Sequence, residues 1–380
     1  MPLHLKVLSA TSESKLSPKP RKRARKDDTT TAEEAADKDH VTATTTTTGR
    51  CVNVADRYDK VGRVGAGTYG IVYKAKDRLT GNYVALKRCI PHHESSDGFP
   101  ITTLREIQSL RLCAGHPNIV ALETVAVSRS GVFLVFQYCE HDIGDLIDSY
   151  YAEHRKSPFP QAAVKTLLRQ LLGALEFLHG RNLIHRDVKA NNLLYTNKGC
   201  LKLADFGLSR PYADHHHGAL LTPTVASLWY RPPELLLGAT TYTQASLDIW
   251  ATGCIFGELL QGCPLANGKD EIDQMDKVVQ CLGVPTVADW PDLYQLPLLR
   301  NNGIQFPPSS RRTLLDTFGY LSDRGLQLLT TMLQYNPAKR WTAAKALTSA
   351  YFEEGPLPTP CSDMPRFKSL HEKHGSSKKH

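Results

Sequence analysis

Three glycines at a fixed spacing begin the part of the chain whose residue types could do chemistry. Gly65, Gly67 and Gly70 form a G-x-G-x-x-G pattern, which alone is a weak signal because dinucleotide-binding folds and chance also produce it. In a dinucleotide fold the third glycine opens a helix, whereas here residues 71–73 continue as an apolar strand. Glycine backbone can approach phosphate oxygens closely, so the pattern predicts a hairpin lying over phosphates. An ordinary hairpin is the alternative.

A lysine follows on the next predicted strand. Lys87 ends residues 84–87, which read Val-Ala-Leu-Lys. A charge among apolar neighbours is costly unless it is paired, so we expect a carboxylate and phosphates as its partners. The candidate carboxylate is Glu106, in a stretch predicted to be helical from about 101 to 113. Taken alone, Lys87 could equally be an exposed strand lysine.

A third group of polar residues lies at 185–192, which read His-Arg-Asp-Val-Lys-Ala-Asn-Asn. Eighteen residues after Asp187, the sequence Asp-Phe-Gly begins at Asp205. The two segments resemble the catalytic loop H-R-D-L-K-x-x-N and the D-F-G of eukaryotic protein kinases, with Val188 in place of the usual leucine. Because both motifs occur in the family's order, chance is a poor explanation for the pair.

This resemblance implies a role for each polar side chain. Asp187 would orient a substrate hydroxyl and accept its proton, while Lys189, which is typical of serine/threonine kinases, would lie near the γ-phosphoryl. Asn192 and Asp205 would hold magnesium beside the ATP phosphates. The implied cofactors are therefore ATP and Mg²⁺. The implied catalytic residues are Asp187, Lys189, Lys87 and Glu106.

The resemblance also implies a nucleotide site. Residues 136–139 would form a hinge whose backbone receives adenine, and Asp142 would contact the ribose. Apolar side chains above and below would enclose the adenine ring, although each could equally be an ordinary core residue. The implied ATP-binding positions are Gly65, Gly67, Gly70, Val72, Ala85, Lys87, Gln137, Cys139, Asp142 and Leu194.

Within the kinases, the chain is most similar to cyclin-dependent kinases. Residues 100–106 read P-I-T-T-L-R-E, close to the family's PSTAIRE-type helix and to its PITSLRE and PISSLRE variants. The resemblance implies that a cyclin pushes this helix inward, so that Glu106 reaches Lys87. Downstream, it implies a structural ion pair between Glu234 and Arg340, and an Asp248 that braces the catalytic-loop backbone.

Activation by phosphorylation is a further implication. Thr222 matches the family's phosphorylation site in the activation segment. Three arginines could bind its phosphate, namely Arg105, Arg186 and Arg210. The alternative is that Thr222 is an exposed turn residue. Thr68 and Tyr69 match positions where phosphorylation inhibits the family, because phosphates there would repel those of ATP.

The family prefers a proline directly after the phosphorylated Ser or Thr. The pocket for that proline would involve Val225, Ala226 and Arg231. Ala226 replaces the family's usual valine, which puts this preference in doubt for the present chain. The expected partners are thus a cyclin and protein substrates with Ser/Thr-Pro sites.

The elements that must position these residues divide the chain into lobes and tails. Residues 58–139 are strand-rich and 140–352 are helical, including an apolar helical stripe that ends before Gly180. The predicted fold class is α+β, a bilobal kinase with a small β-rich N-lobe and a larger helical C-lobe. Residues 1–52 are predicted to be a disordered basic tail, and residues 353–380 a flexible C-terminal tail.

Composition narrows the remaining functions. The net charge of +8 owes much to the tails, whose basic cluster reads as a nuclear-import signal or simply as a solvated charge run. We therefore expect no nucleic-acid binding by the core. The nine cysteines lack zinc or redox spacing and are expected to be reduced thiols. No stretch approaches the roughly 18 apolar residues of a membrane span, so we expect an intracellular, nuclear and/or cytoplasmic protein.

Three other readings remain. A catalytically inactive pseudokinase scaffold is disfavoured, because loss of a catalytic residue is its usual mark and all five, Lys87, Glu106, Asp187, Asn192 and Asp205, are present. A nucleic-acid binder driven by the basic tails is a second alternative. A mitogen-activated type is disfavoured because position 224, two residues after Thr222, is threonine rather than tyrosine.

Overall fold

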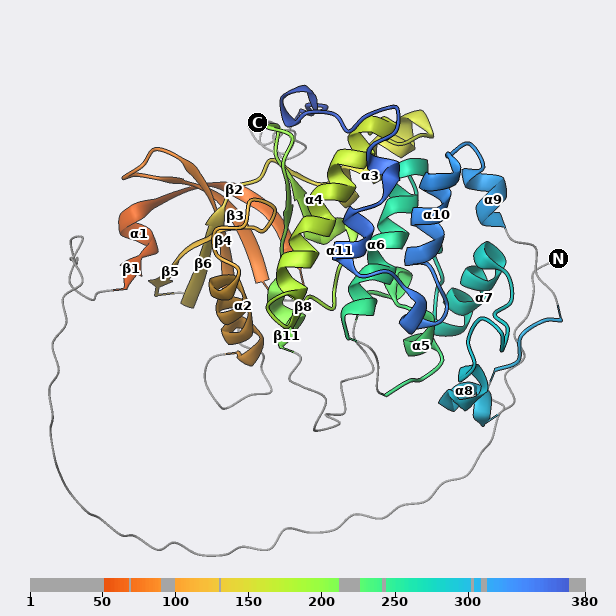
Figure 1. Cartoon of the computed structure of the whole chain (residues 1–380). Coiled ribbons are helices and arrows are strands. Elements are labelled where there is room, and N and C mark those ends of the chain that lie inside the picture. The colour runs from red at the N-terminus through yellow and green to blue at the C-terminus, as the bar shows by residue number, and fades with distance from the viewer. Residues whose placement is uncertain are drawn as a thin grey trace, which may run out of the picture.

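The computed structural model describes residues 51–67, 70–89, 100–129, 131–211, 226–240, 244–301, 304–308 and 313–368. These residues form two lobes, one built on a β-sheet and one on helices (Figure 1). The fold is therefore α+β and bilobal, as predicted. The predictions for Thr68, Tyr69, Thr222 and Val225 lie outside the described residues, as do those for residues 1–50 and 369–380 of the two tails.

The N-lobe sheet has six strands in the order β1-β5-β6-β4-β3-β2. All neighbouring strands are antiparallel except β1 and β5. The strands are β1 Val52–Asn53, β2 Tyr58–Gly67, β3 Gly70–Asp77, β4 Tyr83–Cys89, β5 Leu122–Ser128 and β6 Gly131–Gln137. Both faces of the sheet are covered, because Phe133 and Val135 pack into an outer cluster while Leu134 and Phe136 join the main core. This explains why residues 132–136 are apolar without alternation.

The lobe begins earlier than the sequence indicated. Strand β1 and the short helix α1 (Val54–Arg57) precede residue 58, and Val54 is buried. Together these two elements span only residues 52–57, too few to give a recognisable pattern. Composition alone therefore assigned residues 51 and 52 to the disordered tail.

The N-lobe helix that the sequence predicted is α2, Ile101–Leu112. One face of α2 buries Glu106, Ser109 and Leu110, and it packs against the segment that follows Asp205. The opposite face exposes Ile101 and Leu104, which are 62% and 46% exposed. The helix is thus fixed on its inner side and open on its outer side.

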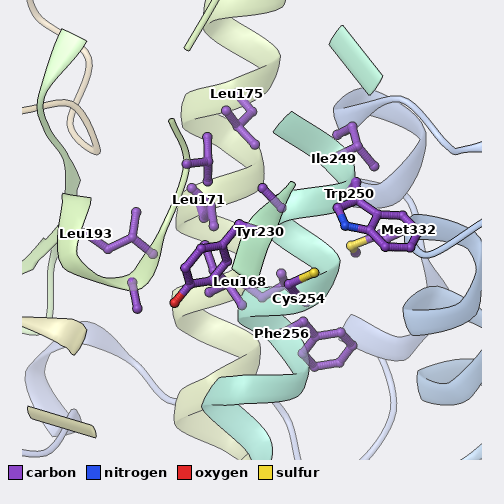
Figure 2. Packing of buried hydrophobic residues seen from close by; sticks show 14 of the residues in the cluster. Leu168, Leu171, Leu175, Leu193, Tyr230, Ile249, Trp250, Cys254, Phe256 and Met332 are labelled. Atoms are coloured by element: carbon purple, nitrogen blue, oxygen red, sulfur yellow. The ribbon is translucent and has the colours of Figure 1, made fainter. Parts of the chain in front are cut away.

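The C-lobe core lies between two long helices, α4 (Gln161–His179) and α6 (Gln244–Gln261) (Figure 2). The leucines of the predicted apolar stripe, from Leu167 to Leu178, are completely or almost completely buried on α4. Gly180 caps the helix at the predicted position. Trp250 and Phe256 of α6 complete this core.

Shorter elements surround these two helices. Two small sheets, in the orders β10-β9-β7 and β11-β8, carry the loops of the cleft. Their strands are β7 His141–Asp142, β8 Leu183–Ile184, β9 Leu193–Tyr195, β10 Leu201–Leu203 and β11 Arg210–Pro211. The remaining helices are α3 Ile143–His154, α5 Pro233–Leu236, α7 Glu271–Leu282, α8 Pro297–Arg300, α9 Thr313–Phe318, α10 Asp323–Met332 and α11 Ala343–Leu347.

Residues 353–368, here called the strap, correct the prediction of a flexible tail from residue 353. Lys165 Nζ donates to Glu354 O at 2.8 Å, and Tyr195 OH donates to Pro365 O at 2.6 Å. Met364 is 3% exposed, and the Phe367 ring packs edge-on against Phe159. The Pro-rich composition concealed these anchors, because donors from the C-lobe satisfy the strap backbone.

Two compositional predictions bear on the described part of the chain. All nine cysteines lie within it, and none of them forms a disulfide. Among the described residues, no helix combines the length and apolar character that crossing a membrane requires.

Candidate active site

A cavity of about 470 Å³ lies between the lobes. Its walls come from the N-lobe strands, the hinge after β6 and the first small sheet of the C-lobe. Most of the predicted ATP-binding positions line it, namely Gly65, Gly70, Val72, Ala85, Lys87, Gln137, Cys139, Asp142 and Leu194. The sequence therefore located this cavity, although its residues lie far apart in the chain.

The glycine-rich segment forms the hairpin between β2 and β3, with Gly67 paired to Gly70. Gly70 has φ +154°, and a Cβ at this position would lie 2.2 Å from Arg88 O. Only glycine fits there, because any side chain would collide with the backbone of the neighbouring strand β4. The hairpin is thus pressed onto β4, directly beside the lysine that β4 presents to the cavity.

The buried charges of the cleft meet around Lys87. Its Nζ lies 2.8 Å from Glu106 Oε1 of α2 and 3.1 Å from Asp205 Oδ1. Burial alone would lower the pKa of the Lys87 ammonium, but the charges of Glu106 and Asp205 outweigh it and raise that pKa above its ordinary value. Lys87 is therefore a cation at neutral pH, and the predicted contact with Glu106 is present.

Asp205 is held in an unusual backbone conformation. Its φ of +61° is in the left-handed region, two residues after the end of β10 and directly before the 3₁₀ turn Phe206–Leu208. Burial tends to raise the pKa of this carboxyl, yet the nearby Lys87 leaves it below its usual value. Asp205 is thus an anion that faces the cavity.

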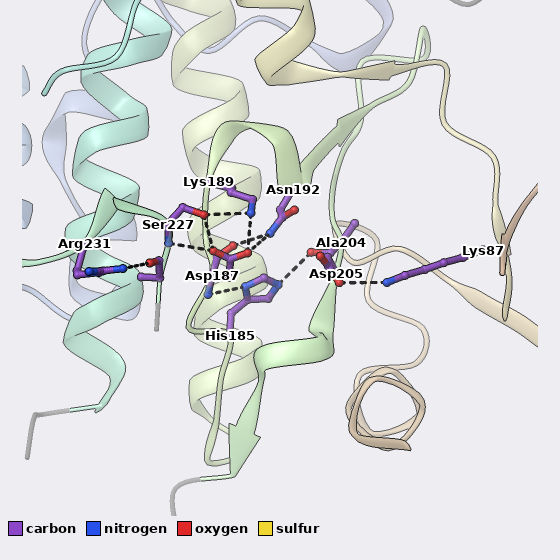
Figure 3. A network of polar contacts seen from close by, with 10 residues as sticks. Lys87, His185, Asp187, Lys189, Asn192, Ala204, Asp205, Ser227 and Arg231 are labelled. Atoms are coloured by element: carbon purple, nitrogen blue, oxygen red, sulfur yellow. Dashed lines mark hydrogen bonds and ion pairs between the residues drawn. The ribbon is translucent and has the colours of Figure 1, made fainter. Parts of the chain in front are cut away.

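Asp187 lies at the centre of a hydrogen-bond network (Figure 3). Its Oδ1 accepts from the Ser227 hydroxyl at 2.9 Å and from the Ser227 N–H at 3.2 Å. Its Oδ2 accepts from Lys189 Nζ at 2.8 Å and from Asn192 Nδ2 at 3.0 Å. The catalytic loop and Ser227 together thus hold the Asp187 carboxylate in place, each through one of its oxygens.

The backbone of the catalytic loop is braced from below. Arg186 has φ +68°, a left-handed conformation that non-glycine residues adopt only when their surroundings enforce it. Asp248 of α6 enforces it, since its two oxygens accept the N–H groups of His185 and Arg186, each at 2.9 Å. His179 Nε2 is also 2.9 Å from Asp248. The expected bracing role of Asp248 is present in the structure.

His185 links the catalytic loop to the strand before Asp205. Its Nε2 lies 3.0 Å from Ala204 O, and its Nδ1 lies 3.3 Å from the N–H of Asp187. Since a carbonyl can only accept and an N–H can only donate, Nε2 carries the proton and Nδ1 accepts. The His185 imidazole therefore links the backbone at Asp187 to the backbone directly before Asp205.

The hinge and α3 form the far end of the cavity. The Gln137 N–H donates to Ala121 O at 3.0 Å, so of the two backbone groups of Gln137 only the carbonyl can bind a ligand. Asp142 caps α3 by accepting from the Asp145 N–H at 3.1 Å. Burial, followed by the charge of Asp145, raises the pKa of Asp142 to about 8.

Two of the three predicted phosphate-receiving arginines are neighbours below the cleft. Arg186 is 3% exposed, and its Nη1 is buried with no hydrogen-bond partner among the described residues. Burial and the neighbouring Arg186 both lower the pKa of Arg105. Arg210 lies in β11, paired with Ile184 just before the catalytic loop. Thr222 itself lies outside the described residues.

The segment that begins at Ala226 carries the residues expected to contact the protein substrate. Ala226 has φ +66°, and Arg231 Nη2 donates to its carbonyl at 3.0 Å. Further on, Arg340 forms a bidentate ion pair with Glu234, with distances of 2.7 and 2.6 Å between buried side chains. The sequence predicted the ion pair of Glu234 with Arg340, whereas it grouped Ala226 and Arg231 in one pocket without predicting their hydrogen bond. Val225 lies outside the described residues.

Sequence reasoning missed several residues of the site. Ser227 contacts both Asp187 and Lys189, but it lies 40 residues from Asp187 and belongs to no motif of its own. Val64, Val120 and Ala204 line the cavity and were not identified. Small and apolar residues give no signal in a sequence, since they occur equally in any core.

Comparison with known proteins agrees with this geometry. A family model described as "Protein kinase domain" matches residues 58–352. The chain is 46% identical to cyclin-dependent kinase 10 of Homo sapiens over 84% of its own length and 86% of that protein. It is 43% identical to the probable cyclin-dependent kinase 10 of Dictyostelium discoideum, covering 82% of this chain and 83% of the other.

A plant relative extends the same likeness. Cyclin-dependent kinase G-1 of Oryza sativa subsp. indica is 40% identical, over 87% of this chain and 48% of that protein. The chain therefore belongs to the protein kinase family, within the cyclin-dependent kinase group of serine/threonine protein kinases.

Proposed function

We propose that the cleft of this kinase binds magnesium-ATP and that Asp187 is the base of phosphoryl transfer. The observation that carries this proposal is the convergence of Lys87, Glu106 and Asp205 at one wall of a cavity of about 470 Å³. A buried ammonium between two carboxylates is suited to bind phosphate oxygens. Val72 and Ala85 of the N-lobe strands and Leu194 of β9 also line the cavity, and apolar side chains of this kind are suited to a flat base.

Asp187 would act on the hydroxyl of the protein substrate. As that oxygen forms its bond to the γ-phosphorus, the bond from phosphorus to the β-phosphate oxygen breaks, and the hydroxyl proton passes to Asp187. Lys189, 2.8 Å from Asp187, would balance charge on the transferred group. Ser227 orients Asp187 by donating to its other oxygen.

The residues present fit a magnesium ion. Asn192 Nδ2 donates to the carbonyl and to the carboxylate of Asp187, so its amide oxygen is the group that can ligate a cation. Asp205, with its lowered pKa, is an anionic oxygen ligand. Oxygen donors of this kind suit magnesium, which would neutralise charge between the β and γ phosphates.

We further propose that a cyclin docks on the outer face of α2. The names of the relatives describe cyclin-dependent kinases. On α2 of this chain, the apolar residues Ile101 and Leu104 are exposed on the face opposite Glu106. Large exposed apolar side chains on one helix face are typical of a protein interface. Binding there would favour the position of α2 in which Glu106 contacts Lys87.

Selectivity for Ser-Pro and Thr-Pro sites is also proposed. The carbonyl of Ala226 points to Arg231, which donates to it at 3.0 Å. An ordinary residue after the phosphorylated position would bring an N–H that finds no free acceptor there, whereas proline has none. The alanine thus supports the same preference as the family's valine, because the backbone rather than the side chain supplies it.

Phosphorylation of Thr222 would complete the site. The buried Arg186 Nη1 lacks a partner among the described residues, and Arg105 lies close enough that the charge of Arg186, in addition to burial, lowers the pKa of Arg105. Two neighbouring guanidinium groups repel each other unless an anion lies between them, and a phosphothreonine would supply that negative charge.

Nuclear entry is proposed on the sequence alone. The basic cluster near the N-terminus consists of Lys19, Arg21, Lys22, Arg23, Arg25 and Lys26. A fluorescent fusion lacking residues 1–50 should lose nuclear enrichment, and an unchanged distribution would contradict this assignment.

The kinase assignment is tested by transfer of labelled γ-phosphate to a matched pair of peptides. The full chain, with Mg²⁺ and ATP, should label a Ser-Pro peptide faster than a Ser-Ala peptide, and chelation of Mg²⁺ should abolish labelling. Lys87→Met is the inactive control. Equal labelling of both peptides would reject the proline preference, and labelling by Lys87→Met at the wild-type rate would reject the assigned site.

A further inference from the structure

Two serines from distant parts of the chain meet beside the cleft, in the seam where α2 packs against the segment after Asp205. Ser109 Oγ and Ser209 Oγ are 2.7 Å apart, although the residues are separated by 100 positions. They are only 5% and 1% exposed. The Ser209 hydroxyl also lies 2.6 Å from Phe206 O. Neither serine lines the nucleotide cavity.

The direction of these hydrogen bonds follows from counting protons. Each serine hydroxyl has one proton to donate. Since the Phe206 carbonyl can only accept, Ser209 donates its proton to it, and Ser109 must donate to Ser209. The result is a chain from the Ser109 hydroxyl through the Ser209 hydroxyl to Phe206 O. Hydrogen bonds in such a chain polarise and strengthen one another.

The position of this chain on α2 connects it to the active site. Ser109 lies three residues after Glu106, so both side chains project from the same face of the helix. Glu106 contacts Lys87, while Ser109 contacts the backbone of the Asp-Phe-Gly segment through Ser209. An outward movement of α2 would break both contacts. It would also leave a buried hydroxyl without a partner, which is costly.

We propose that Ser109 and Ser209, here called the serine latch, are positioning residues that hold α2 where Glu106 reaches Lys87. This inference rests on the proposed function, in which α2 is the element that a cyclin biases. The latch adds a polar link between α2 and the magnesium-binding segment, so that the two move together. The isolated chain consequently keeps part of the active arrangement before any partner binds.

The test uses the full chain and three variants, Ser109→Ala, Ser209→Ala and the double variant. The control is Ser349→Ala, which removes the hydroxyl of another nearly buried serine, 7% exposed, that accepts from the Tyr351 N–H in the C-lobe. Hydrogen–deuterium exchange of the α2 amides, residues 101–112, reports the position of the helix. Initial rates with the Ser-Pro peptide report catalysis.

Each single latch variant should reduce α2 protection and kcat/KM by about fivefold, the effect of one lost hydrogen bond. The double variant should be no worse than either single variant, because the two hydroxyls act as one unit. Ser349→Ala should lower thermal stability while leaving α2 exchange unchanged. If Ser209→Ala does not fold, Ser109→Ala reads the same bond, and alanine is well tolerated in a helix.

Two results would overturn the latch. One is additive effects of the two substitutions, and the other is α2 exchange in Ser109→Ala that matches Ser349→Ala. A wild-type chain that transfers no phosphate would instead count against the proposed kinase site, since the exchange measurement needs no catalysis. The two failures are therefore distinguishable.

Discussion

The two sides of the cleft are built in different ways. On the C-lobe side, Asp187 receives four hydrogen bonds from three residues, and Asp248 clamps the backbone beneath it. On the N-lobe side, Lys87 is placed by one strand and Glu106 by one helix, and α2 is open on its outer face. The Asp187 carboxylate is thus held from several sides, whereas the contact between Lys87 and Glu106 depends on the position of the single helix α2. This difference is consistent with the proposal that a cyclin acts on α2.

The largest effect is expected from a substitution on the C-lobe side of the cleft. Asp187→Asn keeps the size of the side chain but removes the proton acceptor, and we expect phosphoryl transfer to fall by about 10²- to 10⁴-fold. ATP binding, measured by calorimetry, should be nearly unchanged because Asp187 does not line the nucleotide cavity. Rates close to wild type would refute the assignment of Asp187 as the base.

The adjustable side should respond less strongly. Glu106→Gln leaves Lys87 with Asp205 as its charged partner, and loss of a hydrogen bond to a charged group predicts a fall in kcat/KM of about 10- to 100-fold. The matched control is Glu123→Gln, an exposed carboxylate on β5 of the same lobe. A loss as large as that of Asp187→Asn would show that the two sides are not separable.

Substrate choice should change without loss of chemistry. Arg231→Met frees the Ala226 carbonyl, so the preference for a Ser-Pro over a Ser-Ala peptide should fall by about fivefold, the effect of one hydrogen bond. Glu271→Gln is the control, because it removes the ion-pair partner of Arg231 but keeps the donor to Ala226. The ratio of kcat/KM values for the two peptides decides the matter, and an unchanged ratio would exclude this explanation of selectivity.

The smallest effect is expected from the strap. Phe367→Ala removes a ring that packs against Phe159 and Tyr195, and we expect a loss of about 1–2 kcal/mol from the buried apolar area. Thermal unfolding should shift down by a few degrees. Leu357→Ala, on the same strap but 64% exposed, should not shift it. Equal shifts for the two variants would mean that the strap is not anchored through Phe367.

Local patterns predicted the elements well where periodicity was strong. Helices α2 and α4 and strands β3, β4 and β6 lie where the apolar residues indicated. The predicted boundaries were wrong at the strap and at the start of the sheet, for a common reason. β1 has only two residues and the strap is rich in Pro, so neither gives a periodic pattern. Both are ordered by hydrogen-bond partners on residues far away in the chain.

By itself, the sequence determined which charged and amide side chains serve the cleft, because Lys87, Glu106, Asp187, Asn192 and Asp205 lie in motifs whose spacing is specific. Only the tertiary structure decided how they are held. Ser227 on Asp187, the serine latch and the left-handed backbone of Ala226 come from segments brought together by folding. Small polar residues and backbone conformations leave no periodic trace, since their roles depend on distance in space rather than on position in the chain.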